Sequence, residues 1–186
     1  RAARGVLPVV GVPAATRGLR DRLEGCRERG LTRSAYGRVE GGVIGNSSCK
    51  PETLAYFEEL ERMALPPICT GVRVLPGRGP FNVAAINNRA ARTAKGEVLC
   101  LLNNDTEVIS PDWMDEMVAA LWRPGVGAVG AKLLWPNGMV QHAGVVMGVY
   151  AGAVHAGPDL MRDDSGYCGR ALVTQRCSAV TAACLM

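Results

Sequence analysis

Three consecutive polar residues, Asn103, Asn104 and Asp105, follow the apolar run EVLCLL and could bind a metal ion. A hard divalent cation such as Mg²⁺ or Mn²⁺ that holds a diphosphate needs one or two protein carboxylates and takes its other ligands from water and phosphate oxygens. Asn and Asp are also common in turns that close a strand, which gives the tripeptide a purely structural explanation. By itself, so short a motif favours the turn.

Two other segments could share this site because they also follow apolar runs. The run LPVVGVP ends at Pro13, and the run RVEGGVIG ends at Gly45 and is followed by Asn46 and Ser48. In open α/β sheets, ligands bind outside the carboxyl ends of the strands. We therefore expect both segments and the Asn-Asn-Asp tripeptide to lie on one rim of a sheet.

The rest of the chain predicts strands and helices that alternate, as such a sheet requires. LPVVGVP is typical of a buried strand, and the apolar residues after it recur at helical spacing until Gly30. RVEGGVIG predicts a second strand. A helix from Pro51 follows it, with one apolar face. The apolar residues at helical spacing before Gly30 are Leu19, Leu23 and Cys26. Those of the helix from Pro51 are Leu54, Phe57, Leu60 and Ala64.

Later elements continue the alternation. The run VRVL predicts a strand, residues 86–94 a helix, and EVLCLL the strand before the tripeptide. Ser110 and Pro111 predict the N-cap and first residue of a helix that reaches Trp122. VGAVGAKLLW, MVQHAGVVMGV and ALVTQRCSAVTAACLM predict further strands. The whole predicts an α/β fold with a mostly parallel sheet and helices on both faces.

Composition and charge exclude several classes of protein. The chain has 186 residues, 48% of them hydrophobic and 20% charged, which predicts one folded domain. The net charge of +4 is concentrated in an Arg-rich start, which favours a solvated helix face over a membrane contact. The chain has no Lys/Arg run with interleaved aromatic residues, so its sequence does not indicate nucleic-acid binding. No apolar stretch is long enough to span a bilayer, so we expect a cytoplasmic protein.

Cysteine and histidine usage does not indicate zinc. The 7 cysteines include no CxxC pair and are odd in number, which argues against a complete disulfide framework. They are interpreted as small buried hydrophobic residues. His142 and His155 have no metal-ligating companions at the usual spacing, so structural or hydrogen-bonding roles are expected.

A longer pattern runs from Pro51 to Met186. Here the chain resembles the bacterial family-two glycosyltransferases, many of which add sugars to cell-surface polysaccharides. The resemblance is most specific in its long middle block. The matching stretches are PETLAYFEELE, GPFNVAAINNRAARTAKGEVLCLLNNDTEVISPDWMDEM, PGVGAVGAKLLWPNGMVQHAGVVMG and SAVTAACLM.

The resemblance implies a GT-A fold, which is the Rossmann-like fold of nucleotide-diphospho-sugar transferases. It also implies inverting transfer from a UDP- or dTDP-sugar to an acceptor hydroxyl, with a divalent metal, Mg²⁺ or Mn²⁺. The tripeptide becomes a DXD-like motif in which Asp105 is the metal ligand. Asn103 replaces the acidic first residue and is expected to orient ribose or sugar hydroxyls.

The family pattern assigns further site residues. Asn88 corresponds to the Asn of an RNxG-like element whose helix lines the donor pocket, and a surface or capping Asn is the alternative. Asn82 and Asn87 are weaker candidates of the same kind. His142, in QHAGV, is expected to approach the donor or acceptor sugar, although a hydrogen-bonded histidine on a strand is the preferred interpretation.

The N-terminal third departs from the family pattern. A Thr usually follows the Pro of the first strand, and an Asp that contacts base or ribose follows the second strand. Ala14 and Gly45 stand at these places here, while Asn46 and Ser48 are kept. The loss weakens the expected nucleotide affinity and is compatible with a degenerate, non-catalytic nucleotide-sugar-binding module.

No catalytic base is assigned within the chain. The family places its base further along, beyond Met186, and Asp163 and Asp164 are expected to face solvent. The apolar run at Met186 predicts that the domain continues. On this view residues 1–105 are the nucleotide-binding half, residues 106–186 begin the acceptor-side half, and these 186 residues alone do not transfer sugar.

Partners and one further alternative follow from the same interpretation. The acceptor is expected to be a saccharide or a lipid-linked saccharide, reached by peripheral association with the inner face of the membrane. No nucleic acid is expected. A sugar-phosphate nucleotidyltransferase is the remaining alternative, but PAATRGLRD is a poor match to the Gly-rich phosphate loop that such an enzyme needs.

Overall fold

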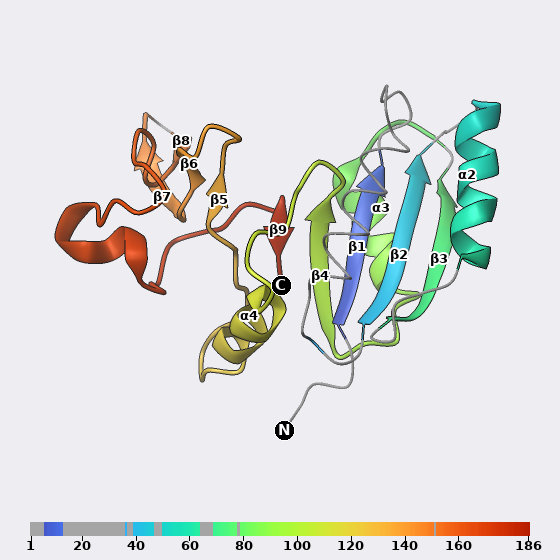
Figure 1. The fold of residues 1–186 in the computed structure, drawn as a ribbon, viewed down its shortest axis with the longest axis horizontal. Coiled ribbons are helices and arrows are strands. Elements are labelled where there is room, and N and C mark those ends of the chain that lie inside the picture. Colours follow the sequence, from blue (N-terminus) through green and yellow to red (C-terminus); the bar gives the residue numbers. More distant parts are fainter. Residues whose placement is uncertain are drawn as a thin grey trace.

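The main sheet of the molecule has five strands (Figure 1). The computed structural model describes residues 6–12, 36, 39–46, 50–63, 69–77, 79–150 and 152–186. The strand order is β3-β2-β1-β4-β9; the first four strands are parallel, and β9 pairs antiparallel with β4. The mostly parallel sheet predicted from the sequence is therefore confirmed. Its strands are β1 (Val6–Val12), β2 (Val39–Asn46), β3 (Cys69–Gly77), β4 (Val98–Asn103) and β9 (Cys184–Leu185).

Helices cover both faces of this sheet, as predicted. The register aligns Val43 of β2 with Leu102 of β4 through β1, so both side chains lie on one face. There Val43 packs against α2, and Leu102 packs against α4. Ile44 and Leu101 point the opposite way, toward α3. The helices are α2 (Pro51–Arg62), α3 (Val83–Ala91) and α4 (Trp113–Leu121).

Helix α2 begins at Pro51, as predicted, because proline needs no hydrogen-bond partner for its nitrogen in the first turn. The buried stripe differs slightly from the predicted one. It runs through Tyr56, Phe57 and Leu60, which leaves the side chain of Leu54 46% exposed. The helix expected through Leu19 lies outside the described residues.

The starts of the other two helices differ from the predictions. Helix α3 starts three residues earlier than expected because the Asn82 side chain caps it, accepting a 2.9 Å hydrogen bond from the Ala85 N–H. The predicted Ser110 cap of α4 is wrong. The carbonyl of Ser110 instead closes a turn by accepting from the Trp113 N–H, and Asp112 precedes the helix. None of the helices in the described part of the chain is long and apolar enough to cross a membrane.

The segment after α4 forms two small antiparallel ladders beside the main sheet (Figure 1). The strands predicted around VGAVGAKLLW and MVQHAGVVMGV are therefore present, although short. Most of the last predicted strand, residues 171–186, is not present: its first two residues belong to a 3₁₀ segment, whose backbone angles differ from those of a strand, and only Cys184–Leu185 is extended and paired as a strand. These elements are β5 (Leu133–Leu134), β6 (Val140–His142), β7 (Val145–Val149), β8 (Gly152–His155) and η1 (Tyr167–Leu172).

Strand β9 returns the chain to the main sheet and has hydrogen-bonded neighbours on both sides. On one side it pairs with β4. On the other, Met186 and Val129 exchange two backbone hydrogen bonds of 2.7 and 2.8 Å, and the Ala131 N–H donates to Cys184. The last residues therefore belong to the same core as α4 and β4.

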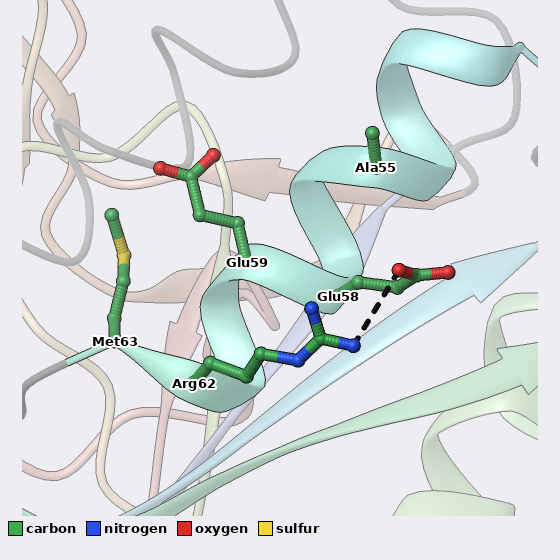
Figure 2. Close-up of a pocket in the computed structure, with 5 residues that line it drawn as sticks. All are labelled: Ala55, Glu58, Glu59, Arg62 and Met63. Atoms are coloured by element: carbon green, nitrogen blue, oxygen red, sulfur yellow. Dashed lines mark ion pairs between the residues drawn. The ribbon is translucent and has the colours of Figure 1, made fainter.

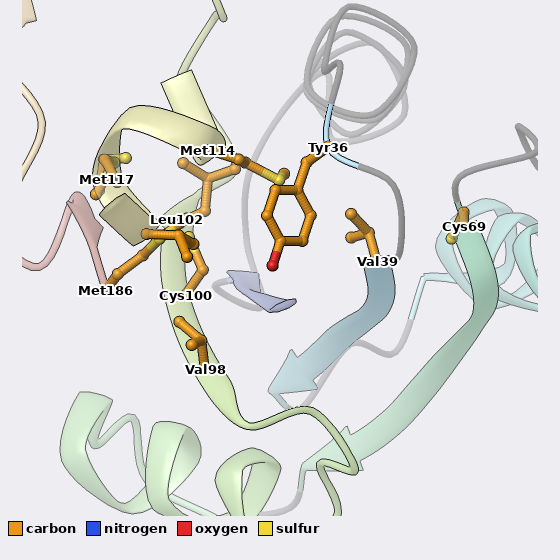
Figure 3. Close-up of a cluster of buried hydrophobic side chains, with 11 residues drawn as sticks. Tyr36, Val39, Cys69, Val98, Cys100, Leu102, Met114, Met117 and Met186 are labelled. Carbon is orange, nitrogen blue, oxygen red and sulfur yellow. The ribbon is translucent and has the colours of Figure 1, made fainter. Parts of the chain in front are cut away.

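This core is drawn in Figure 3, where Met114 and Met117 of α4 meet Cys100 and Leu102 of β4. Its cysteines behave as small hydrophobic residues, as predicted, because Cys69, Cys100 and Cys184 are buried free thiols. The same prediction is wrong for two cysteines of the C-terminal segment, which are exposed, and two others lie outside the described residues. The exposed pair is Cys168 and Cys177; the undescribed pair is Cys26 and Cys49.

Candidate functional site

The carboxyl ends of the parallel strands bring the predicted polar segments to one edge. The register places Gly11 of β1 beside Asn103, and Val12 beside Gly45. Since neighbouring strands lie about 4.8 Å apart, the Gly45 and Asn103 backbones are separated by roughly 10 Å across β1. Asn46 and Asn103 are the last residues of their strands. The edge that joins these strand ends is called the rim below.

Some predicted rim residues lie outside the described part of the chain. Pro13, Ala14 and Ser48 are among them, although Val12 leads directly from β1 to Pro13. For Asn46 only the backbone is described, at the end of β2 opposite Gly77 of β3. These residues keep their roles as predictions, and the site is built from the ends of β2 and β4.

The Asn-Asn-Asp tripeptide forms a turn at the end of β4. The Asn103 carbonyl accepts hydrogen bonds from the Thr106 hydroxyl at 2.7 Å and the Thr106 N–H at 3.4 Å. The Asn103 N–H donates to the Ala183 carbonyl at 2.9 Å, which ties the turn to the residues just before β9. The structural interpretation of the motif is therefore correct for its backbone, and the side chains of Asn104 and Asp105 remain candidates for a second role.

The side chain of Asn104 is the unusual group of this turn. It is only 7% exposed, and its Nδ2 atom has no hydrogen-bond partner among the described residues. A buried donor without a partner costs about 1–3 kcal/mol. Because most buried polar groups have a hydrogen-bond partner, this unpaired amide is a candidate contact for a ligand. Asp105, the next residue, is exposed and carries the only carboxylate of the tripeptide.

The donor set at the rim fits one particular kind of metal site. No group of three or more His, Cys, Asp or Glu side chains that could hold a metal ion occurs within the described ranges. A preformed, all-protein metal cage is therefore absent from them. Mg²⁺ and Mn²⁺ that bind together with a diphosphate use one or two carboxylates, and the exposed Asp105 offers one next to an unpaired amide donor.

The predicted asparagines of α3 have different roles. Asn82 caps the helix, so its side-chain oxygen is already engaged. Asn88 lies further along α3 with an exposed side chain, and its carbonyl accepts from the Arg92 N–H in the helical pattern. The helix begins on the rim side because β3 ends there. A donor contact of Asn88 stays a prediction.

His142 is placed in the interior, with its side chain 1% exposed. Its Nδ1 atom lies 2.9 Å from Nδ1 of His155 on β8, and its Nε2 atom accepts from the Thr181 N–H at 3.4 Å. Both ring nitrogens therefore have protein partners, and the ring offers no open surface to a sugar. The expected direct sugar contact is not supported by this arrangement, which agrees with the preferred hydrogen-bonded interpretation.

Sequence reasoning missed the partner of His142. The two histidines are separated by 13 residues and meet because the chain passes through β6, β7 and β8, with β7 and β8 paired. Burial, followed by the neighbouring His155 ring, lowers the pKa of His142. The ring is therefore neutral near pH 7. Because Nε2 accepts a hydrogen bond, the proton resides on Nδ1 and is donated to His155.

A shallow hollow on α2 does not compete with the rim as a functional site (Figure 2). All its lining residues belong to one helix and its C-cap. The charged pair drawn there, Arg62 and Glu58, is separated by 3.7 Å and is mostly exposed, so it contributes little beyond helix stability. The lining residues are Ala55, Glu58, Glu59, Arg62 and Met63.

Both the sequence and the fold have known counterparts. A family model described as glycosyl transferase family 2 matches residues 10–177. Among solved structures, the chain is similar to the mannosyltransferase PcManGT from Pyrobaculum calidifontis in complex with GDP-Man and Mn²⁺. The TM-score is 0.55 at 20% identity, over 74% of this chain and 37% of that one. The likeness concerns the fold, which is the predicted GT-A fold.

Two curated relatives are much longer than this chain. A Sinorhizobium fredii protein described as uncharacterized protein y4gI is 43% identical over 179 residues, which cover 96% of this chain and 19% of the relative. The O-antigen biosynthesis protein RfbC of Myxococcus xanthus is 46% identical over 125 residues, covering 67% of this chain and 9% of the relative. The chain thus spans less than a fifth of either relative.

Proposed function

Because this chain belongs to glycosyl transferase family 2, we propose that it transfers a sugar from a nucleotide-diphosphate sugar to an acceptor hydroxyl, with inversion at the anomeric carbon. The observation that carries the proposal is the Asn-Asn-Asp turn at the carboxyl end of β4. It combines an exposed carboxylate with a buried amide donor that lacks a partner among the described residues. This is the edge at which open α/β sheets bind their ligands.

Each residue of the turn has a separate proposed task. Asp105 would hold a divalent metal, Mg²⁺ or Mn²⁺, which neutralises charge on the leaving diphosphate when it is bound. The Asn104 Nδ2 group donates a hydrogen bond to an oxygen of the nucleotide-sugar. This removes the free-energy cost of burying an amide N–H without an acceptor. Asn103, exposed at the end of β4, orients ribose or sugar hydroxyls. The Mn²⁺ in the structure of PcManGT supports metal use in this fold.

The donor and acceptor are proposed by class. The donor is a nucleoside-diphosphate sugar: UDP- and dTDP-sugars follow from the sequence resemblance, and the GDP-Man bound to PcManGT adds a guanine nucleotide to the panel. The acceptor is a saccharide or lipid-linked saccharide of a cell-surface polysaccharide, an assignment supported by the O-antigen relative. We place this reaction in the cytoplasm, at the inner face of the membrane.

The catalytic base is proposed to lie outside the acidic loop around Asp163. The Asp164 carboxylate accepts a 2.7 Å hydrogen bond from the Met161 N–H and so closes a turn. The Asp163 side chain is 95% exposed and lies 3.9 Å from Arg162. Both groups thus have ordinary structural surroundings. On this proposal the 186 residues bind donor and do not transfer sugar without a base from elsewhere in the protein.

A non-catalytic nucleotide-sugar-binding module is the second candidate, favoured by Gly45. The family carries an Asp near this place, and the buried glycine backbone of β2 offers no side-chain acceptor to base or ribose. The same rim and the same metal site would then serve binding alone. Turnover of the donor distinguishes the two functions.

The metal assignment is tested at Asp105. Calorimetry of GDP, UDP and dTDP binding with Mn²⁺ should show a clear loss of affinity in Asp105→Asn. Loss of an outer-shell partner alone typically weakens metal affinity by about 10-fold to 100-fold, and a direct ligand should matter at least as much. Asp163→Asn is the matched control, because this carboxylate is exposed in a different loop. Equal affinities of wild type and Asp105→Asn would contradict the assignment.

A further inference from the structure

The segment 179–183 connects the buried histidine to the Asn-Asn-Asp turn. Its Thr181 N–H donates to Nε2 of His142 at 3.4 Å, at the long end of the hydrogen-bond range. Two residues later, the Ala183 carbonyl accepts the 2.9 Å hydrogen bond from the Asn103 N–H. The Thr181 hydroxyl joins these points by accepting from the Ala183 N–H at 3.4 Å. A short run of hydrogen bonds thus links His142 to the turn.

From these contacts we propose that His142, oriented by His155, is a positioning residue that sets segment 179–183 and through it the turn at residues 103–105. This inference rests on the proposed function, since it assigns a role toward the donor and metal site. His142 touches neither metal nor sugar. It acts through the backbone of Thr181 and Ala183.

Other contacts restrict segment 179–183 so that a change at His142 is transmitted to it. The Val145 N–H of β7 donates to the Ala179 carbonyl at 3.0 Å. At Gly130 the segment packs so closely that an added Cβ would lie 2.6 Å from Cβ of Val180. The segment is therefore held from both sides, and the histidine fixes its centre.

The state of the His142 ring decides whether it can perform this task. Accepting from Thr181 requires a bare Nε2, so the ring must be neutral with its proton on Nδ1. His155 selects this tautomer. Its Nδ1 atom lies 2.9 Å from Nδ1 of His142 and accepts the hydrogen bond from the His142 Nδ1–H. The two rings meet edge to face, at 79° between their planes and 4.8 Å between their centroids. His155 is exposed, so its Nε2–H can be solvated.

Two similar amide side chains test this geometry. In His142→Gln the side-chain oxygen reaches the position of Nε2 and can still accept from the Thr181 N–H. In His142→Asn the shorter side chain reaches only the position of Nδ1, and that acceptor is lost. Both variants are polar and lack the ring, so they lose aromatic packing to a similar extent.

The measurement is the affinity for GDP, UDP and dTDP in the presence of Mn²⁺, by calorimetry, with melting temperature measured in parallel. We expect His142→Gln to bind close to wild type and His142→Asn to bind about fivefold more weakly, the effect of one ordinary hydrogen bond. His155→Leu removes the group that selects the tautomer and should also weaken binding. Because the His155 ring is exposed, we expect this variant to remain folded, so that its affinity can be measured.

The outcomes separate this inference from the proposed function. If wild type binds the nucleotides through Asp105 and His142→Asn binds as tightly as His142→Gln, the positioning role is wrong, even if both variants melt earlier. If wild type shows no metal-dependent nucleotide binding, the proposed function fails first. If either amide variant is unfolded, equal affinities of His155→Leu and wild type overturn the inference.

Discussion

Asn104 and Asp105 are adjacent in the sequence and lie in opposite environments. The amide of Asn104 is buried, and Nδ2 has no partner within the described ranges, whereas the carboxylate of Asp105 is exposed. A buried, preoriented donor discriminates between ligands that do and do not accept its hydrogen bond. An exposed carboxylate can be reached by a hydrated metal ion. Together they suit a ligand that brings both phosphate oxygens and a cation.

The buried ring of His142 makes the stability of the protein depend on pH. Burial, and then the neighbouring His155 ring, lower its pKa below the ordinary 6.5. The unfolded chain therefore takes up the proton at higher pH than the folded chain. The contribution of the neutral ring is complete above the unfolded pKa and is lost as the pH falls through the folded pKa.

We expect the melting temperature to fall more steeply between about pH 7 and about pH 5 in wild type than in His142→Gln, which cannot titrate at this position. Thermal unfolding followed by circular dichroism measures the difference. A long-range ¹H–¹⁵N correlation spectrum reports the tautomer directly and should show His142 protonated at Nδ1. Parallel pH profiles of the two proteins would show that the ring is not buried in its neutral form.

Among the elements, β9 and the segment before it depend on close packing against residues 129–131. The backbone of Gly130 lies beside Val180, and Leu185 forms a bridge to Gly130. Close-packed interiors resist added atoms because neighbouring side chains and backbone must shift. A glycine is therefore needed at position 130 because there is no space for a side chain. The backbone angles of Gly130 do not themselves require glycine.

Gly130→Ala should destabilise the protein by about 1–3 kcal/mol, the usual cost of overpacking. Its added Cβ would stand 2.6 Å from the branched Cβ of Val180, which cannot move away as a flexible chain end could. Gly127→Ala is the matched control, since its Cβ would have no atom within 4 Å. Urea denaturation compares the two. A Gly130→Ala variant as stable as Gly127→Ala would mean that segment 179–183 is not held at this distance.

On the scale of the whole molecule, the main sheet holds the rim, and the C-terminal ladders lie beside this sheet (Figure 1). Strand β9 connects the two parts because it pairs with β4 after the chain has passed through β5 to β8. The rim end of β4 is therefore joined to residues near the end of the sequence, since the Asn103 N–H donates to the Ala183 carbonyl. The division into a nucleotide-binding half and an acceptor-side half stays a prediction.

A donor-turnover assay separates the enzyme from the binding module. Ligand binding to the folded chain alone should raise its stability, by about 2.7 kcal/mol at a ligand concentration 100 times Kd, for either function. Release of free nucleoside diphosphate from a panel of nucleotide sugars should occur only for an enzyme, when a saccharide acceptor is present. Metal-dependent stabilisation without any release, in the natural protein that carries this chain, would favour the module.

The sequence alone was sufficient for the four parallel strands of the main sheet and for the edge at which their carboxyl ends meet. Apolar runs such as EVLCLL and helix signals such as Pro51 act through local backbone preferences and periodicity, which one segment contains by itself. Parallel strands then place their carboxyl ends at one edge, so Asn46 and Asn103 could be assigned to the rim. The starts of α3 and α4 were missed because several nearby polar residues could each have formed the cap.

Tertiary structure alone decided how the site is supported. The burial of Asn104, the meeting of His142 with His155, and the passage of Val180 beside Gly130 all join residues that sequence spacing does not relate. Such contacts depend on how β9 and the ladders fold back onto the sheet, and many pairings of short strands satisfy the same local preferences. Only the folded chain selects one of them, and it thereby determines which polar groups face a ligand and which face one another.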